Sequence, residues 1–191
     1  MSFFCRIKRY FDDLWHKLCE CRWRAVLCFV IAALGVAASV ALIKAFNYSW
    51  WYYNRCAFAE TLFAGGFSLF FFFLAGSFAY FLCIVLCNLI PQTRFFNYLL
   101  LFVAGFYCGA NTTATIVCFS VWGVFFAILV ALPELVTYAL ASFLAACEYP
   151  CCRRFRESWC DFRHCFLILA LGFAVKILGF FAILRIITAV I

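Results

Sequence analysis

Very long runs of this chain carry almost no charge, and this restricts the possible folds more than any other feature. Residues 95–147 form a stretch of 53 residues whose only charged side chain is Glu134. As one helix, this stretch would be about 80 Å long at ~1.5 Å per residue. The hydrocarbon core of a bilayer is only about 30 Å thick. The stretch is therefore predicted to form a hairpin of two helices.

The composition also favours lipid as the main solvent. Hydrophobic residues make up 70% of the 191 residues and charged residues 12%, whereas soluble domains have about 45–50% and about 25%. A membrane barrel would alternate polar and apolar residues in segments of about ten, but the apolar runs here are continuous. We predict an all-α protein, a polytopic transmembrane helical bundle.

About five spans are expected, with an amphipathic interfacial helix before them. The predicted spans are residues 25–43, 67–90, 96–118, 122–146 and 166–184. The hairpin turn is expected near Ser120–Gly123. The first apolar run, Ala25 to Ile43, has 19 residues and exceeds the roughly 7–15 of a signal-peptide core. We therefore expect this run to be retained as a span.

Lys and Arg are unevenly distributed between the two sides of this arrangement. Eleven lie in the segment 1–24, the link after the second span and the Cys- and Arg-rich loop 147–165, against two on the opposite side. Positive residues concentrate in cytoplasmic loops. We expect a multi-pass protein of the cell membrane, with a cytoplasmic amino terminus and an extracytoplasmic carboxyl terminus.

Two segments outside the spans are expected to contact membrane lipid. Residues 3–18 place apolar side chains at helical spacing, which indicates a helix in the cytoplasmic headgroup region. It would anchor the first span or, as an alternative, dock a partner or sense curvature. Residues 47–55 contain four consecutive aromatic residues, typical of an interfacial belt. These aromatics could instead bind sugars or a partner's ectodomain.

The chain has 14 cysteines, but their predicted positions argue against disulfides. Most lie on or near the reducing cytoplasmic side, and those within spans behave as small hydrophobic residues. The candidates for a metal site are Cys151, Cys152, Cys160, His164 and Cys165. Their spacing does not match the paired Cys pattern of structural zinc sites. We expect neither a metal nor a cofactor.

Glu134 is the most informative single residue, because an ionisable side chain inside a span is costly and is usually paired or functional. It follows Pro133, which lacks a backbone donor and is expected to kink the helix. Counted from the predicted cytoplasmic ends, Glu134 lies 13 residues and Lys176 10 residues deep. We predict an intramembrane Glu134–Lys176 pair that fixes helix register; the alternative role is a proton or ion relay. Polar groups of residues 111–115 could face it.

Gly105 and Gly109 form a small-xxx-small motif that allows two helix backbones to approach closely. Ala75, Gly76, Ser77 and Ala79 of the second span could form the facing surface. Because these glycines lie in mid-span and no Lys-containing phosphate loop follows, we assign them to helix packing. The protein could also form an oligomer.

Motifs for catalysis are missing from the sequence. There is no nucleophile elbow, no H-E-x-x-H zinc motif and no pair of intramembrane aspartates. We expect no enzymatic activity and no nucleic-acid partner.

In its third and fourth spans the chain resembles the stage II sporulation protein M family. The resemblance rests on Leu101–Phe106 with Gly109, then on Leu132-Pro133-Glu134-Leu135 leading to Ala139 and Ala141. It implies a non-enzymatic membrane scaffold in forespore engulfment that anchors cell-wall hydrolases, the stage II sporulation proteins D and P. The alternatives are a small transporter or permease-like subunit using Glu134 and Lys176 at the midplane, and an envelope assembly protein without conserved chemistry.

Overall fold

The computed structural model describes residues 12, 15, 16, 18–45, 67–89, 95–148 and 155–190. Within these ranges every regular element is a helix, which confirms the all-α prediction. The helices are α2 (Arg22–Ala45), α4 (Phe67–Leu89), α5 (Phe96–Phe119), α6 (Val121–Phe126), the π-helix η2 (Ala127–Ala131), α7 (Leu132–Glu148) and α8 (Phe155–Val190).

Four helical segments are long and apolar enough to cross a membrane. They are Arg22–Ala45, Phe96–Val117, Val121–Ala146 and His164–Ala182. A shorter apolar stretch, Ala75–Asn88, lies within α4. This is the architecture of a helical membrane protein, as the apolar runs predicted.

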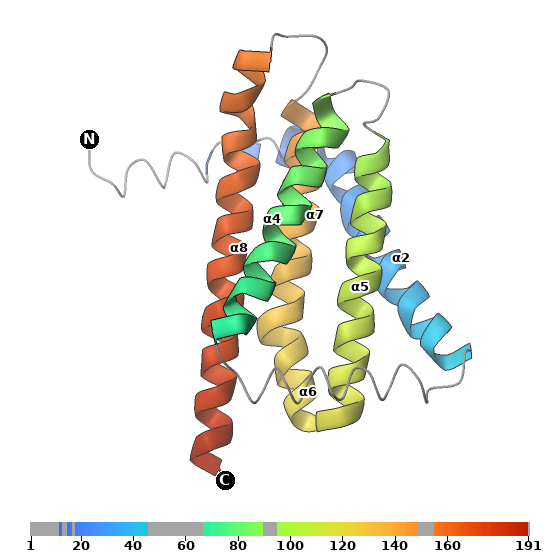
Figure 1. The fold of residues 1–191 in the computed structure, drawn as a ribbon. Helices are drawn as coiled ribbons and strands as arrows, with labels where there is room; N and C mark the ends of the chain where they lie inside the picture. The colour runs from blue at the N-terminus through green and yellow to red at the C-terminus, as the bar shows by residue number, and fades with distance from the viewer. Residues whose placement is uncertain are drawn as a thin grey trace.

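The helices α5, α7 and α8 run roughly parallel, and α2 and α4 are inclined to them (Figure 1). The beginnings of α2, α5 and α8 lie at the same end of the bundle as the ends of α4 and α7 (Figure 1). At this end, Arg24 Nη1 donates to the carbonyl oxygen of Ala146 at 3.2 Å. A cation is favourable at the last carbonyls of a helix, so this contact ties the beginning of α2 to the end of α7.

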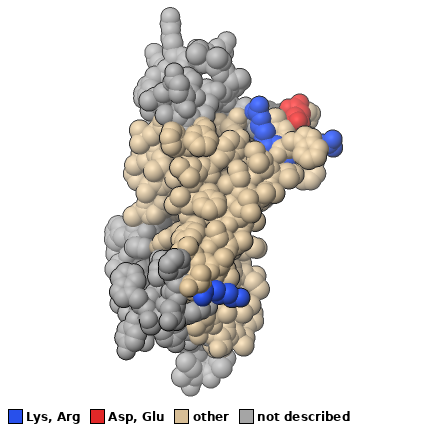
Figure 2. All heavy atoms as spheres, turned by 90° about the vertical axis from the view of Figure 1, so that its right-hand side faces the viewer, with Lys and Arg blue, Asp and Glu red and all other residues tan. Residues whose placement is uncertain are grey.

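On the face that Figure 2 shows, a wide band of the described residues carries no charged side chain. Lys, Arg and acidic groups gather at one end of this face, and a basic group lies toward the other end (Figure 2). The sequence of α2 follows the same pattern, with Arg22 and Arg24 in its first turn and Lys44 in its last. The 19 residues from Ala25 to Ile43 between them carry no charge.

The turn between α5 and α6 lies at Ser120, inside the expected range 120–123. Ser120 has a φ of 47°, and its N–H donates to Ile116 O at 2.8 Å. A Cβ on Gly123 would collide with the backbone of Thr115 and Ile116. The absence of a side chain at Gly123 therefore lets α6 fold back tightly against the end of α5.

The helix that packs against Gly105 and Gly109 is α2. A Cβ on Gly105 would collide with the carbonyl oxygen of Ala32, and one on Gly109 would collide with Ser39. Gly35 of α2 makes the reciprocal approach, because its Cβ would meet the backbone of Phe102 and Phe106. Small residues on both helices thus bring the two backbones together.

The expectation that α4 supplies the surface facing these glycines is wrong. A Cβ on Gly76 would meet no other atom within 4 Å, and Ala75 and Ala79 are exposed. The small residues of α4 therefore do not form the close helix contact that their spacing suggested. The close contact is made instead by Gly35 of α2, which approaches the backbone of Phe102 and Phe106.

Side chains from α2, α4, α5, α7 and α8 meet in the main hydrophobic core. Its fully buried members include Cys28, Ile84, Phe143, Leu144 and Cys165. Phe81 of α4 packs edge-on against Phe166 of α8, with ring centroids 5.4 Å apart. This core lies toward the end of the bundle where α7 ends and α8 begins.

Polar contacts also join α4 to α5 near the link between them. Asn97 Nδ2 donates to Asn88 Oδ1 at 3.0 Å, and Asn88 Nδ2 donates to Ile84 O at 2.8 Å. Both side chains are buried. Buried amides need such partners because burying an unpaired polar group is costly.

The predicted loop 147–165 is much shorter than expected. The helix α7 continues to Glu148 and α8 begins at Phe155, so most of this region is helical. Loss of apolar character marks where a span ends, but the backbone hydrogen bonds of a helix can continue into polar sequence. The end of a span is thus a poor guide to the end of its helix.

Two other predictions fall largely outside the described residues. The aromatic segment 47–55 lies outside them entirely, and so does most of the amphipathic segment 3–18. Of the latter, Leu18 packs against the core cluster, while Trp15 is exposed. Nearby, His16 Nδ1 lies 3.3 Å from Glu20 Oε1.

Candidate functional site

The structure brings Glu134 of α7 and Lys176 of α8 into direct contact. Lys176 Nζ lies 2.6 Å from Glu134 Oε1. The Lys176 side chain is 7% exposed and that of Glu134 is 17% exposed. A charge in this apolar setting is tolerable only when it is paired and hydrogen-bonded. The pair therefore neutralises two charges that neither helix could carry alone.

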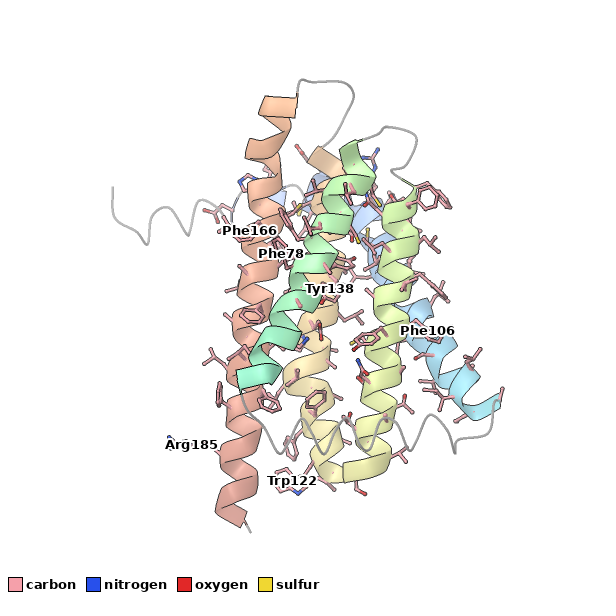
Figure 3. All side chains as sticks on the ribbon, in the orientation of Figure 1. Phe78, Phe106, Trp122, Tyr138, Phe166 and Arg185 are labelled. Carbon is pink, nitrogen blue, oxygen red and sulfur yellow. The ribbon has the colours of Figure 1, made fainter. Side chains whose placement is uncertain are left out.

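Tyr138 is the third member of the site, and the sequence analysis missed it. Its hydroxyl donates to Glu134 Oε1 at 2.8 Å, so one carboxylate oxygen accepts from both Lys176 and Tyr138. Tyr138 lies four residues after Glu134, and residues at this spacing share a helix face. That spacing could have revealed it. Figure 3 shows Tyr138 near the centre of the bundle.

Two glycines of α8 lie on either side of Lys176 and bring α7 close. A Cβ on Gly172 would collide with the side chain of Thr137, and one on Gly179 would collide with the carbonyl oxygen of Leu129. Gly172, Lys176 and Gly179 are spaced by four and three residues, so they lie on one face of α8. The ion pair thus lies between two close approaches of the α8 backbone, one to the Thr137 side chain of α7 and one to the Leu129 carbonyl of η2.

The backbone departs from α-helical geometry directly before this site. The π-helix η2 covers Ala127–Ala131, and the N–H of Leu132 donates to Ala127 O across it. Pro133 has no N–H to donate to the carbonyl oxygen of Leu129 four residues earlier. This is the oxygen against which Gly179 packs.

A second helix supports the same segment from the other side. Cys108 of α5 is buried, and its Sγ donates to Ala131 O at 3.3 Å. Thus α5 contacts the carbonyl at the end of the π-helix, while α8 contacts the carbonyl at Leu129. Cys108 is therefore a structural hydrogen-bond donor as well as an apolar core residue.

Aromatic stacking links the site to α4. The rings of Tyr138 and Tyr80 are stacked, with centroids 4.2 Å apart and an interplanar angle of 24°. The Tyr80 hydroxyl and Ser142 Oγ share a buried hydrogen bond of 2.8 Å. The ion pair, Tyr138, Tyr80 and Ser142 therefore form a continuous chain of contacts from α8 through α7 to α4, in which ring stacking joins the two tyrosines.

The polar residues expected from the third span are arranged differently. Thr113 Oγ1 donates to Gly109 O at 2.8 Å, and Thr115 Oγ1 donates to Asn111 O at 3.0 Å. Both hydroxyls thus bond to the backbone of their own helix, as Thr commonly does. The thiol of Cys108 of α5 instead bonds to another element, because it donates to Ala131 O of η2.

The proposed metal ligands are not brought together among the described residues. Cys151 and Cys152 lie outside the described ranges, and only the backbone of Cys160 is described. Cys165 is fully buried and its Sγ donates to Ala141 O at 3.4 Å. His164 is half-buried. In the described part of the chain, no three His, Cys, Asp or Glu residues could hold a metal ion, and the cysteines form no disulfide.

The fold and this site define the class of protein: a helical membrane protein with a charged pair enclosed between span-length helices. Comparison with known proteins adds no relative. No family model, curated protein or solved structure matches the chain.

Proposed function

We propose that this chain is a non-enzymatic, multi-pass membrane protein that acts as a scaffold for other membrane proteins. The observation that supports this proposal is the closed form of the ion pair. Glu134 is held by both Lys176 and Tyr138, and glycine contacts enclose the pair on both sides. Charges satisfied in this way are suited to holding helices in register, which a scaffold requires.

The proposed topology has five spans, with α4 as the second. Its 23 residues give a length of about 34 Å at ~1.5 Å per residue, enough for a core of about 30 Å. The asymmetry of eleven Lys and Arg against two favours a cytoplasmic amino terminus. With an odd number of spans, the carboxyl terminus lies outside.

A reporter fused after Ile191 tests this topology. Alkaline phosphatase, which folds only outside the cytoplasm, is expected to be active in this fusion, while green fluorescent protein at the same position remains dark when exported through the general secretion pathway. The matched control places each reporter before residue 22, where the activities should be reversed. Fluorescence from the carboxyl-terminal fusion would mean an even number of spans and would refute the five-span arrangement.

The proposed partners are cell-wall hydrolases, and the proposed process is forespore engulfment. Both rest on the resemblance to the stage II sporulation protein M family in residues 101–109 and 132–141. These residues lie in α5 and α7, and Cys108 of α5 contacts Ala131 of η2, the residue directly before α7.

Deletion of the gene in a spore-forming host tests this function. We expect membrane-stained sporulating cells to stop at the septum, and the wild-type gene supplied in trans to restore engulfment. The tagged protein should also co-purify with a hydrolase from solubilised sporulating membranes. Normal engulfment in a strain without a second copy would refute the proposed process.

A second candidate function is transport, with Glu134 and Lys176 at the substrate or proton path. The observation that favours it is the π-helix and Pro133 directly before Glu134, because broken helices beside charged groups are typical of transporter sites. Uptake by proteoliposomes that depends on a pH gradient and is lost in Glu134→Gln, with the fold retained, would support transport over the scaffold.

A further inference from the structure

We propose that Ala127–Pro133 is a hinge in the fourth span and that the Glu134–Lys176 pair holds this hinge in the conformation described here. These residues form the hinge segment. It separates α6 from α7, which otherwise form one span-length unit, Val121–Ala146. The proposal does not depend on which partners or substrates the protein has.

The backbone hydrogen bonding of the hinge segment is incomplete for a chemical reason. Pro133 cannot donate to Leu129 O, and the π-helix makes bonds across five residues instead of four. Such bulges are rare and occur frequently at functional sites. A change of this segment from π to α geometry would shift the register by one residue. At ~3.6 residues per turn, this would rotate α6 by about 100° relative to α7.

Contacts from two other helices hold the π geometry in place. Gly179 of α8 packs against Leu129 O, and Cys108 Sγ of α5 donates to Ala131 O. Both contacts are made to carbonyl groups, which move when the hydrogen-bond register changes. The described conformation is therefore maintained from outside the hinge segment.

The ion pair lies where it can control the position of α8 along the hinge segment. Lys176 is three residues before Gly179 on the same helix, and Glu134 directly follows Pro133. The 2.6 Å contact between them therefore sets how Gly179 meets Leu129. Farther along α7, beyond Glu134 from the hinge segment, this helix is tied to α4 by Tyr138, Tyr80 and Ser142. Loss of the pair should release α6 and the hinge segment while the rest of α7 stays fixed.

Hydrogen exchange measured by mass spectrometry on the full-length protein in detergent micelles tests this proposal. In Lys176→Met we expect the acceleration of amide exchange relative to the wild type to be about tenfold larger for residues 121–131 than for residues 138–148. Glu134→Gln, a milder change, should accelerate the same segment. Leu178→Met is the matched control, because Leu178 is 68% exposed on the same helix, and it should have no effect.

A second variant tests the role of the proline. Pro133→Ala supplies the missing N–H, so combining it with Lys176→Met should remove the excess acceleration and bring residues 121–131 to within about twofold of residues 138–148. Equal acceleration of residues 121–131 and 138–148 in Lys176→Met would show that the pair stabilises only the bundle as a whole and would overturn the hinge. Unchanged exchange at 121–131, or failure of Pro133→Ala to reverse the effect, would overturn it as well.

Discussion

Lys176→Met should lower the free energy of unfolding by about 3–5 kcal/mol, because breaking a buried ion pair leaves the remaining charge unpaired. Glu134 would keep its hydrogen bond from Tyr138 but lose the cation 2.6 Å away. The side chain of Met has a volume similar to that of Lys, so the substitution should remove the charge without leaving a cavity. Reversible unfolding in mixed micelles, followed by circular dichroism, measures the loss.

The double variant Glu134→Gln/Lys176→Met should lose less free energy of unfolding than the two single variants lose together. Removing both charges leaves no unpaired ion, and replacing a whole buried pair is often nearly neutral. Leu178→Met should shift the free energy by no more than about 0.5 kcal/mol, as exposed substitutions usually do. Additive single effects would mean that the two side chains do not interact energetically, whatever their distance.

The double variant also separates the two candidate roles of the pair. If the pair serves to fix helix register, a stable double variant should retain engulfment activity. If it is a relay, the double variant should fold and yet lose transport. The comparison needs folded protein in both cases, and the expected recovery of stability provides it.

Gly105→Leu should lower the free energy of unfolding by about 3 kcal/mol or more. The new side chain would be forced against the Ala32 carbonyl, and α2 would have to move away from α5. Overpacking typically costs about 1–3 kcal/mol, and this site adds the loss of the close contact formed with Gly35 and Gly109. Unfolding in mixed micelles measures this loss too.

Gly76→Leu is the matched control for this prediction. It makes the same chemical change in another span, but the added atoms meet open space. Its effect on stability should stay within about 0.5 kcal/mol, or be slightly favourable, since Gly in a helix interior is unfavourable relative to other residues. Equal losses for Gly105→Leu and Gly76→Leu would contradict the packing of α2 against α5 and would restore α4 as a candidate surface.

Local sequence predicted the helices of this protein well because membrane insertion depends on local properties. Twenty or so apolar residues without charge form a span whatever surrounds them. The 53-residue run required a turn, and the turn lies at Ser120. Helix ends were less predictable. The beginning of α8 at Phe155 is not marked by hydropathy, because the helix continues into polar sequence.

The candidate site was predictable in part, for a related reason. Glu134 and Lys176 are ionisable groups in apolar spans at similar depths, so each needs a partner and each is the nearest one available to the other. Tyr138 was accessible in principle through its spacing of four residues from Glu134. Gly172 and Gly179 were not, because glycines in a span do not reveal which helix approaches them.

The sequence alone determined that the chain is helical, approximately where its spans lie and which charges must meet. Only the tertiary structure decided which helices are neighbours: that Gly105 and Gly109 face α2, that Cys108 reaches Ala131 and that the backbone before Pro133 is a π-helix. The physical reason is that all the spans are similarly apolar toward lipid. Hydrophobicity therefore cannot select their partners, and selection falls to the shape of small residues and to a few polar contacts.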